Sequence, residues 1–234
     1  MEQKDIMCFA GISGIIGSSL PLIMIYASTI LEASFSWNKN ALSDIGVSQT
    51  AWLFNSALII GGLFNLLFAI GLRNYLGKTK WLKIGVSLLI VSSISLSLVG
   101  VFTENYNIIH ALVALRYLLL APLGLVCIGL GEKGHRIGKV SLVLGITALL
   151  AIFGLPIITF VSNLQIGFAV PEFLEALVLS IWTFWVSLKL IQPSTKEKHH
   201  STRKSANYPS FPKKPKSTNS SLEAVHAWQY FCNY

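Results

Sequence analysis

SWNKNALSDIG, residues 36–46, is a polar and turn-rich segment that separates two long apolar runs. The run before it covers about residues 6–31, and the run after it covers about residues 51–72. An α-helix needs about 20 mainly apolar residues to cross the hydrocarbon core of a bilayer. The segment is therefore typical of a connection between two transmembrane helices.

The composition of the whole chain agrees with this interpretation. Only 12% of the residues are charged and 53% are hydrophobic, with a mean hydropathy of +0.63, whereas soluble domains carry roughly 25% charged residues. The pattern predicts an all-α, polytopic membrane protein whose single domain, residues 1–192, is a six-transmembrane-helix bundle. The four further spans are expected at about residues 82–102, 108–130, 140–161 and 170–191.

The composition changes abruptly after the sixth span. Residues 193–234 are rich in Lys, Ser, Pro and Asn. A segment of this composition cannot bury a hydrophobic core. We therefore expect a disordered, basic C-terminal tail.

The basic residues predict the orientation of the bundle. Sixteen of the 18 Lys and Arg residues lie at the N-terminus, around the connections after the second and fourth spans, and from the end of the sixth span onward. The alternate connections contain only Lys39, while Arg116 lies inside the fourth span. Cytoplasmic loops are enriched in Lys and Arg, so we predict an N-in/C-in protein of the cell membrane. The same distribution explains the net charge of +8 without a nucleic-acid partner.

The predicted outer end contains most of the polar residues that could carry chemistry. Ser43 and Asp44 are good helix N-caps, and with Gly46 they also form a typical turn. A short capped helix over the bundle is one interpretation, and a ligand or catalytic role for Asp44 is the other. Asn55 follows in the second span.

Glu104 and His110 flank the second outer connection, which follows the third span, and are expected at the same level. A Glu–His pair could bind metal or shuttle a proton, but a hydrogen-bonded structural histidine is the preferred interpretation of His110. On a helical wheel, Ser93, Ser97 and Gly100 lie on one stripe with Glu104. That stripe indicates either helix packing through small residues or one wall of a polar cavity.

Arg116 is the clearest anomaly inside a span. A charge at that depth costs about 2.5–3.5 kcal/mol or more unless it is paired, so we expect a carboxylate partner. Glu104, Glu172 and Glu175 are the candidates, and the last two share a helix face. The pair would either fix the packing of the bundle or form a site for a substrate anion or a proton.

Several of these segments resemble a known family. NALSDIG at 40–46 followed by Phe54-Asn55, GVFTE at 100–104 leading to His110, and Pro171-Glu172 are similar to the motifs of domain of unknown function 998. This is a family of uncharacterised membrane proteins, mainly archaeal with some bacterial members. The resemblance covers about residues 6–192 and stops before the tail. It implies a six-span fold and a role for the outer polar cluster, and it supplies no activity.

Two function hypotheses follow, and neither specifies an oligomeric state. In the first, the lipid-embedded bundle binds or transports a small or lipid-like ligand at an outward-facing polar pocket. The second is a membrane-embedded, hydrolase-like enzyme that acts on lipid through Asp44, Glu104 and His110. No metal site or cofactor is expected and no catalytic residue is assigned, because no nucleophile, metal-ligand or phosphate-binding motif is present. The candidate binding residues are Ser43, Asp44, Asn55, Glu104, His110, Arg116, Glu172 and Glu175.

Overall fold

The protein is a bundle of helices. A computed structural model describes residues 3–76 and 79–192, so the tail predicted at 193–234 lies outside the described residues. The α-helices are α1 Gln3–Leu31, α2 Ala51–Tyr75, α3 Lys80–Val101, α4 Ile108–Gly131, α5 Arg136–Leu149, α6 Leu155–Val161 and α7 Ala169–Ile191. Two short 3₁₀ helices, η1 Ser43–Val47 and η2 Glu104–Tyr106, lie in the connections, and the π-helix η3 Leu150–Gly154 joins α5 to α6.

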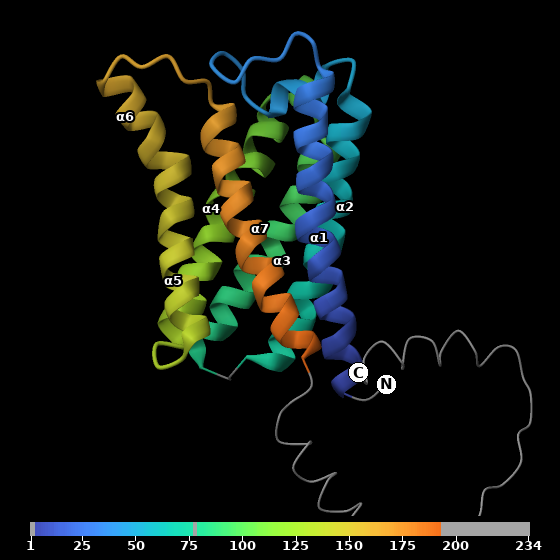
Figure 1. Cartoon of the computed structure of the whole chain (residues 1–234), viewed down its shortest axis with the longest axis vertical. Coiled ribbons are helices and arrows are strands. Elements are labelled where there is room, and N and C mark those ends of the chain that lie inside the picture. Colours follow the sequence, from blue (N-terminus) through green and yellow to red (C-terminus); the bar gives the residue numbers. More distant parts are fainter. Residues whose placement is uncertain (1–2, 77–78, 193–234) are drawn as a thin grey trace, which may run out of the picture.

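Six helical segments in the described part of the chain are long and apolar enough to cross a membrane, with α5, η3 and α6 together forming the fifth. The predicted all-α, six-span fold is confirmed, and the spans begin and end within a few residues of the predicted limits. α1, α2, α3 and α4 each pack against the next helix in the sequence, while α7 packs against α1 and α5. Figure 1 shows α6 leaning away from α7 at the end opposite the N-terminus.

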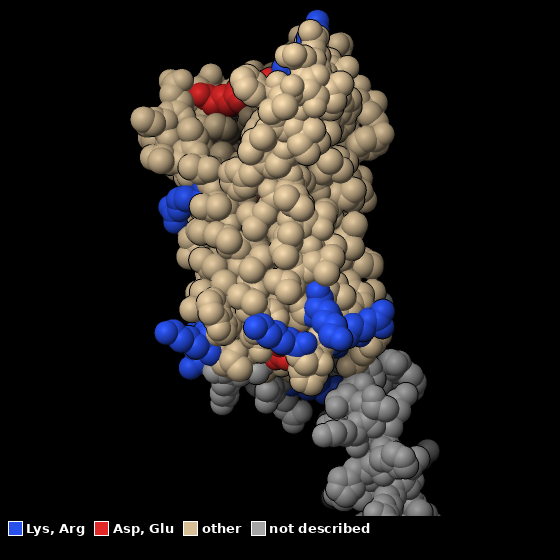
Figure 2. Space-filling model, turned by 90° about the vertical axis from the view of Figure 1, so that its left-hand side faces the viewer, with Lys and Arg blue, Asp and Glu red and all other residues tan. Residues whose placement is uncertain are grey.

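The surface of the bundle divides into a charged end and a wide belt that is almost free of charge. Figure 2 shows Lys and Arg gathered around one end, which we call the basic end. Above it many large apolar side chains are exposed, such as Phe160 at 85% and Ile108 at 73%. Water-soluble proteins rarely expose apolar surface on this scale, so the belt is suited to lipid. We call the opposite end the outer end, following the predicted orientation.

Pro156 accounts for the one irregularity in the spans. The fifth span was predicted as one helix over 140–161, but a π-helix interrupts it at Leu150–Gly154. Proline lacks an N–H, and its ring clashes with the carbonyl four residues earlier, which here belongs to Ile152. The wider π turn accommodates this clash, and α6 then departs from the direction of α5 (Figure 1).

Helix packing depends on close approach at small residues. A Cβ built on Gly62 of α2 would meet the Ser97 hydroxyl and would lie 2.6 Å from the Ser93 carbonyl of α3. A Cβ on Gly100 of α3 would meet the Asn55 carbonyl of α2 at 2.6 Å. The stripe predicted on the third span therefore faces α2 at these positions, and Ser97 Oγ donates to Ile59 O at 3.2 Å.

The buried apolar residues form two clusters. The larger lies toward the basic end and centres on Trp182, which is 1% exposed and packs edge-on against Phe68 at 6.0 Å. The smaller lies toward the outer end and includes the connection residues Leu42 and Ile45. The first outer connection is therefore part of the core and is not a free loop.

Trp182 also donates a buried hydrogen bond from Nε1 to Ser141 Oγ of α5, at 2.8 Å. Trp182→Phe should lower the free energy of unfolding by about 1 kcal/mol through the lost donor, plus a further cost for the volume removed. Thermal unfolding in detergent tests this. Trp52→Phe is the control because Trp52 is 69% exposed, and equal melting temperatures for the two variants would contradict the prediction.

Candidate functional site

The first outer connection is fastened to the start of α7. Gly167 N donates to Trp37 O at 3.1 Å and Ala169 N donates to Asn40 O at 2.9 Å. Leu42 N donates to Glu172 Oε2 at 2.6 Å. We call these three bonds the outer clasp. A Cβ on Gly167 would lie 2.6–2.8 Å from three backbone atoms of residues 37–40, so the clasp requires glycine there.

Asp44 and Asn55 hold the connection in shape. Asp44 Oδ2 accepts hydrogen bonds from Asn40 Nδ2 at 2.7 Å and from Ala41 N at 3.1 Å. Asn55 Nδ2 donates to Gly46 O at 2.9 Å. η1 begins after Leu42 without a side-chain cap, so the predicted capping role of Ser43 and Asp44 is wrong for this helix. Asp44 instead closes the turn that precedes η1.

Glu32 ties the two ends of the connection together. Its Oε1 accepts from Ser34 Oγ at 2.6 Å and its Oε2 accepts from Thr50 Oγ1 at 3.2 Å. Hydrogen bonds from the hydroxyls of Ser34 and Ser48 lower the pKa of Glu32 to about 2.

This pKa gives a pH dependence with a definite sign. A carboxyl group whose folded pKa lies below its usual value of 4.5 stabilises the protein when ionised, and this contribution is lost as the pH falls from 4.5 to about 2. The melting-temperature difference between wild type and Glu32→Gln should therefore be constant at neutral pH and shrink over that range. Ser34→Ala should reproduce part of the difference, and a difference that grows on acidification would contradict the assignment.

A cavity of about 100 Å³, which we call the outer cavity, lies beneath the outer clasp. A single water molecule needs a cavity of roughly 10–15 Å³, so the outer cavity has room for several groups of that size. Its walls come from α1, α2, α3, α4 and α7 and are mostly apolar. The polar lining residues are Ser43, Asn65, His110, Tyr117, Glu172 and Ser180.

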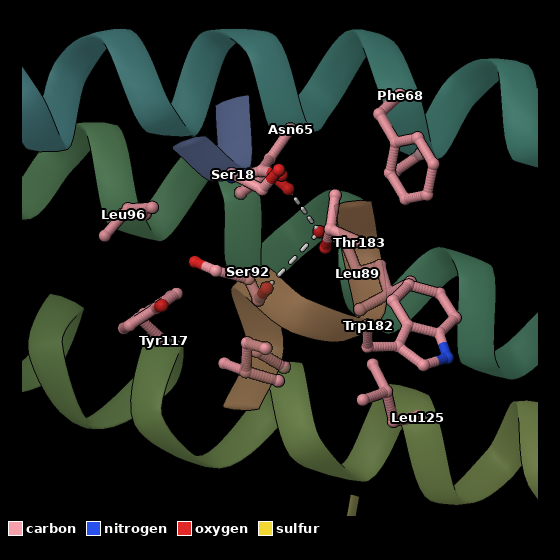
Figure 3. A pocket seen from close by; sticks show the side chains of 15 residues that line it. Ser18, Asn65, Phe68, Leu89, Ser92, Leu96, Tyr117, Leu125, Trp182 and Thr183 are labelled. Atoms are coloured by element: carbon pink, nitrogen blue, oxygen red, sulfur yellow. Dashed lines mark hydrogen bonds between the residues drawn. The ribbon is translucent and has the colours of Figure 1, made fainter. Parts of the chain in front are cut away.

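A second cavity of about 50 Å³ adjoins it deeper in the bundle, and the two share Asn65, Leu96, Tyr117 and Ser180. We call it the hydroxyl cavity because its polar lining consists largely of hydroxyl groups. Figure 3 shows Ser18, Asn65 and Thr183 close together, with the rings of Phe68 and Trp182 to one side. Ser92 Oγ donates to Leu89 O at 3.3 Å, as drawn there.

Glu104 and His110 do not form the pair that their spacing suggested. His110 Nδ1 lies 2.7 Å from Phe102 O, which it contacts across the connection, and no described carboxylate lies within ion-pair distance of its ring. His110 nevertheless lines the outer cavity, whereas Glu104 and Asp44 do not. Both of those carboxylates interact electrostatically with Glu172. Within residues 3–76 and 79–192, no three Asp, Glu, His or Cys side chains are grouped as metal ligands.

Arg116 and Glu175 have different environments. Arg116 is exposed on the flank of α4 and forms no ion pair with any described carboxylate, so the predicted Arg–Glu pair is not formed. A long basic side chain can reach toward the membrane surface from such a position. Glu175 is fully buried, and neither of its carboxyl oxygens has a hydrogen-bond partner among the described residues.

The structure therefore brings Ser43, His110 and Glu172 to one cavity, with Asp44, Asn55 and Glu104 around its outer end. Three of its polar lining residues, Asn65, Tyr117 and Ser180, were not among the predicted site residues. Asn65 had a signal, since it is a polar residue in an apolar span. Tyr117 and Ser180 are ordinary in transmembrane helices, so their types gave no signal.

Fold and surface together define a multi-pass α-helical membrane protein with a polar-ended cavity near one face. The family described as protein of unknown function (DUF998) matches residues 15–189. The chain belongs to this family, as its motifs indicated. No curated protein and no solved structure matches the chain.

Proposed function

We propose that this protein spans the cell membrane with both ends in the cytoplasm and binds a small, single-chain amphiphile in the outer cavity. The observation that carries the proposal is the lining of that cavity, which is apolar along its walls and has polar groups at its outer end and at its junction with the hydroxyl cavity. Small-molecule sites typically combine apolar walls with a few polar groups that orient the ligand. An alkyl chain fits the apolar walls, and a polar head fits the polar groups.

The charges around the outer cavity restrict the head group. Glu172 lines the cavity, and Asp44 and Glu104 add two further acidic groups next to it. Like charges in close proximity repel strongly where water is scarce. An uncharged, hydroxyl-bearing head is therefore favoured over a carboxylate or phosphate, with Ser43 and His110 as additional hydrogen-bonding groups.

Binding is favoured over lipid hydrolysis by the positions of the three residues that the enzyme hypothesis requires. Catalytic acids and bases must lie within hydrogen-bond reach of a shared substrate. His110 lines the outer cavity, while Asp44 is engaged in the turn at Asn40 and Ala41, and neither Asp44 nor Glu104 lines the cavity.

Monolaurin, a single-chain glyceride with an uncharged head, is the probe for the proposal. Purified protein should bind monolaurin more tightly than laurate in a thermal-shift titration. Ala114→Phe, which fills the outer cavity from α4, should abolish this binding. Ala111→Phe is the matched control because Ala111 is exposed on the same helix. Equal binding by the two variants would contradict the proposed site.

The orientation is tested separately. A single cysteine at Lys39 should react with a membrane-impermeant maleimide added to intact cells, and one at Lys133 should react only after lysis. The opposite pattern would contradict the N-in/C-in arrangement.

A further inference from the structure

Glu175 is an acid that the protein buries completely about two turns into α7. Its side chain is 0% exposed, and both carboxyl oxygens are without a hydrogen-bond partner among residues 3–76 and 79–192. Ionised groups inside a membrane are costly and usually have a functional reason. An unpartnered carboxylate in this position requires either a cation or a proton.

Two titratable groups interact electrostatically with Glu175: Glu172, one turn away on α7, and Tyr117 on α4. α1, α2 and α5 also pack against α7, but residues 6–31, 51–72 and 140–161 contain no Asp, Glu, His, Lys or Arg. Arg116 is exposed on the flank of α4. Among the described residues, no Lys or Arg forms an ion pair with Glu175, and no three Asp, Glu, His or Cys side chains are grouped as metal ligands.

We propose that Glu175 is a proton-binding site and exchanges its proton with the outer cavity through Glu172 and Tyr117. A proton removes the charge without requiring any further ligand, which suits a carboxyl group enclosed by apolar neighbours. The site is coupled to the amphiphile of the proposed function, because the head group of that ligand occupies the end of the cavity that Glu172 lines.

The neighbouring residues provide the route. Glu172 lines the outer cavity, and Tyr117 lines both cavities. In the transfer, the O–H bond of protonated Glu172 breaks and an O–H bond forms on the Glu175 carboxylate. The Glu172 carboxylate then regains a proton from outer water. Neither Glu175 oxygen has a hydrogen-bond partner among the described residues, so a bridge by Tyr117 requires its side chain to rotate. The Tyr117 hydroxyl then gives one proton to Glu175 and takes one from Glu172, so it ends unchanged.

Infrared spectroscopy of the protein in lipid at neutral pH tests the site itself. The wild type should show the carbonyl band of a protonated carboxylic acid, and the band should shift when glutamate is labelled with ¹³C. In a Glu172→Gln background, where residue 172 cannot contribute to the band, Glu175→Gln should remove the band, whereas Glu132→Gln at the basic end should retain it. A labelled wild type without a glutamic acid band would overturn the proposal even if the Glu175 variant did not fold. A band that persists in a folded protein carrying both Glu172→Gln and Glu175→Gln would also overturn it.

Deuterium exchange of the same band tests the route and the coupling. In D₂O the band of the wild type should move to lower frequency. Tyr117→Phe should slow this exchange about tenfold or more, in keeping with the usual contribution of a proton-transferring group, and bound monolaurin should slow it as well. Unchanged exchange in both cases would overturn the route. A different result is that monolaurin fails to bind while the band is present and Tyr117→Phe slows its deuterium exchange. That result would overturn the proposed function and leave the proton site standing.

Discussion

Gly62→Leu is expected to lower the free energy of unfolding by at least about 3 kcal/mol, the upper part of the usual range for overpacking. The Cβ alone would lie 2.6 Å from both the Ser93 carbonyl and the Ser97 nitrogen. These are backbone atoms of α3, so they can give way only if the two helices separate. Separation would also break the hydrogen bond from Ser97 Oγ to Ile59 O.

Unfolding in mixed micelles, together with the yield of monodisperse protein, measures the effect of Gly62→Leu. Gly154→Ala is the matched glycine control, because the nearest atom to a Cβ there is Leu150 Cδ2 at 3.6 Å, an ordinary contact. The control should be as stable as the wild type. A Gly62→Leu protein that unfolds at the wild-type midpoint would show that α2 and α3 do not pack as described.

Glu172→Ala is expected to weaken both the outer clasp and ligand binding. The Leu42 N–H would lose its acceptor at 2.6 Å, and a buried donor left unsatisfied costs about 1–3 kcal/mol. The outer cavity would also lose its only lining carboxyl group among the described residues. Monolaurin binding should fall about tenfold, which corresponds to about 1.4 kcal/mol.

Glu172→Gln separates the two effects. Glutamine retains a carbonyl oxygen for the Leu42 N–H, so the melting temperature should stay close to that of the wild type. Glu132→Gln, at the basic end, should change neither stability at the outer end nor binding. A Glu172→Ala protein with wild-type affinity for monolaurin would remove Glu172 from the binding site.

The number of spans and their limits could be predicted from hydropathy, because the bilayer imposes a minimum apolar length on every crossing helix. Which side of each helix faces the bundle could not be predicted in this way. Apart from His110 and Arg116, α4 is apolar all round, so its sequence does not distinguish the side that faces the bundle from the side that faces lipid. Arg116 was therefore expected to point inward to a carboxylate, whereas it lies on the flank.

The candidate site was predictable only where a residue type was unusual for a span. His110 and Glu172 stood out as polar groups at helix ends, and both line the outer cavity. The outer clasp had no comparable signal, because two of its three bonds join backbone atoms, and every residue except proline has the same backbone donor and acceptor. Whether Asp44 would cap a helix or close a turn depended on that backbone arrangement.

The outer clasp also has a consequence for the order of folding. Its side-chain bond joins residues 130 positions apart, and contacts between distant parts of a chain form late. During synthesis the first outer connection emerges long before α7, so it has no partner while the intermediate helices are inserted. The arrival of α7 therefore completes both the outer cavity and the connection that covers it, and a nascent chain halted before residue 167 would lack the whole clasp.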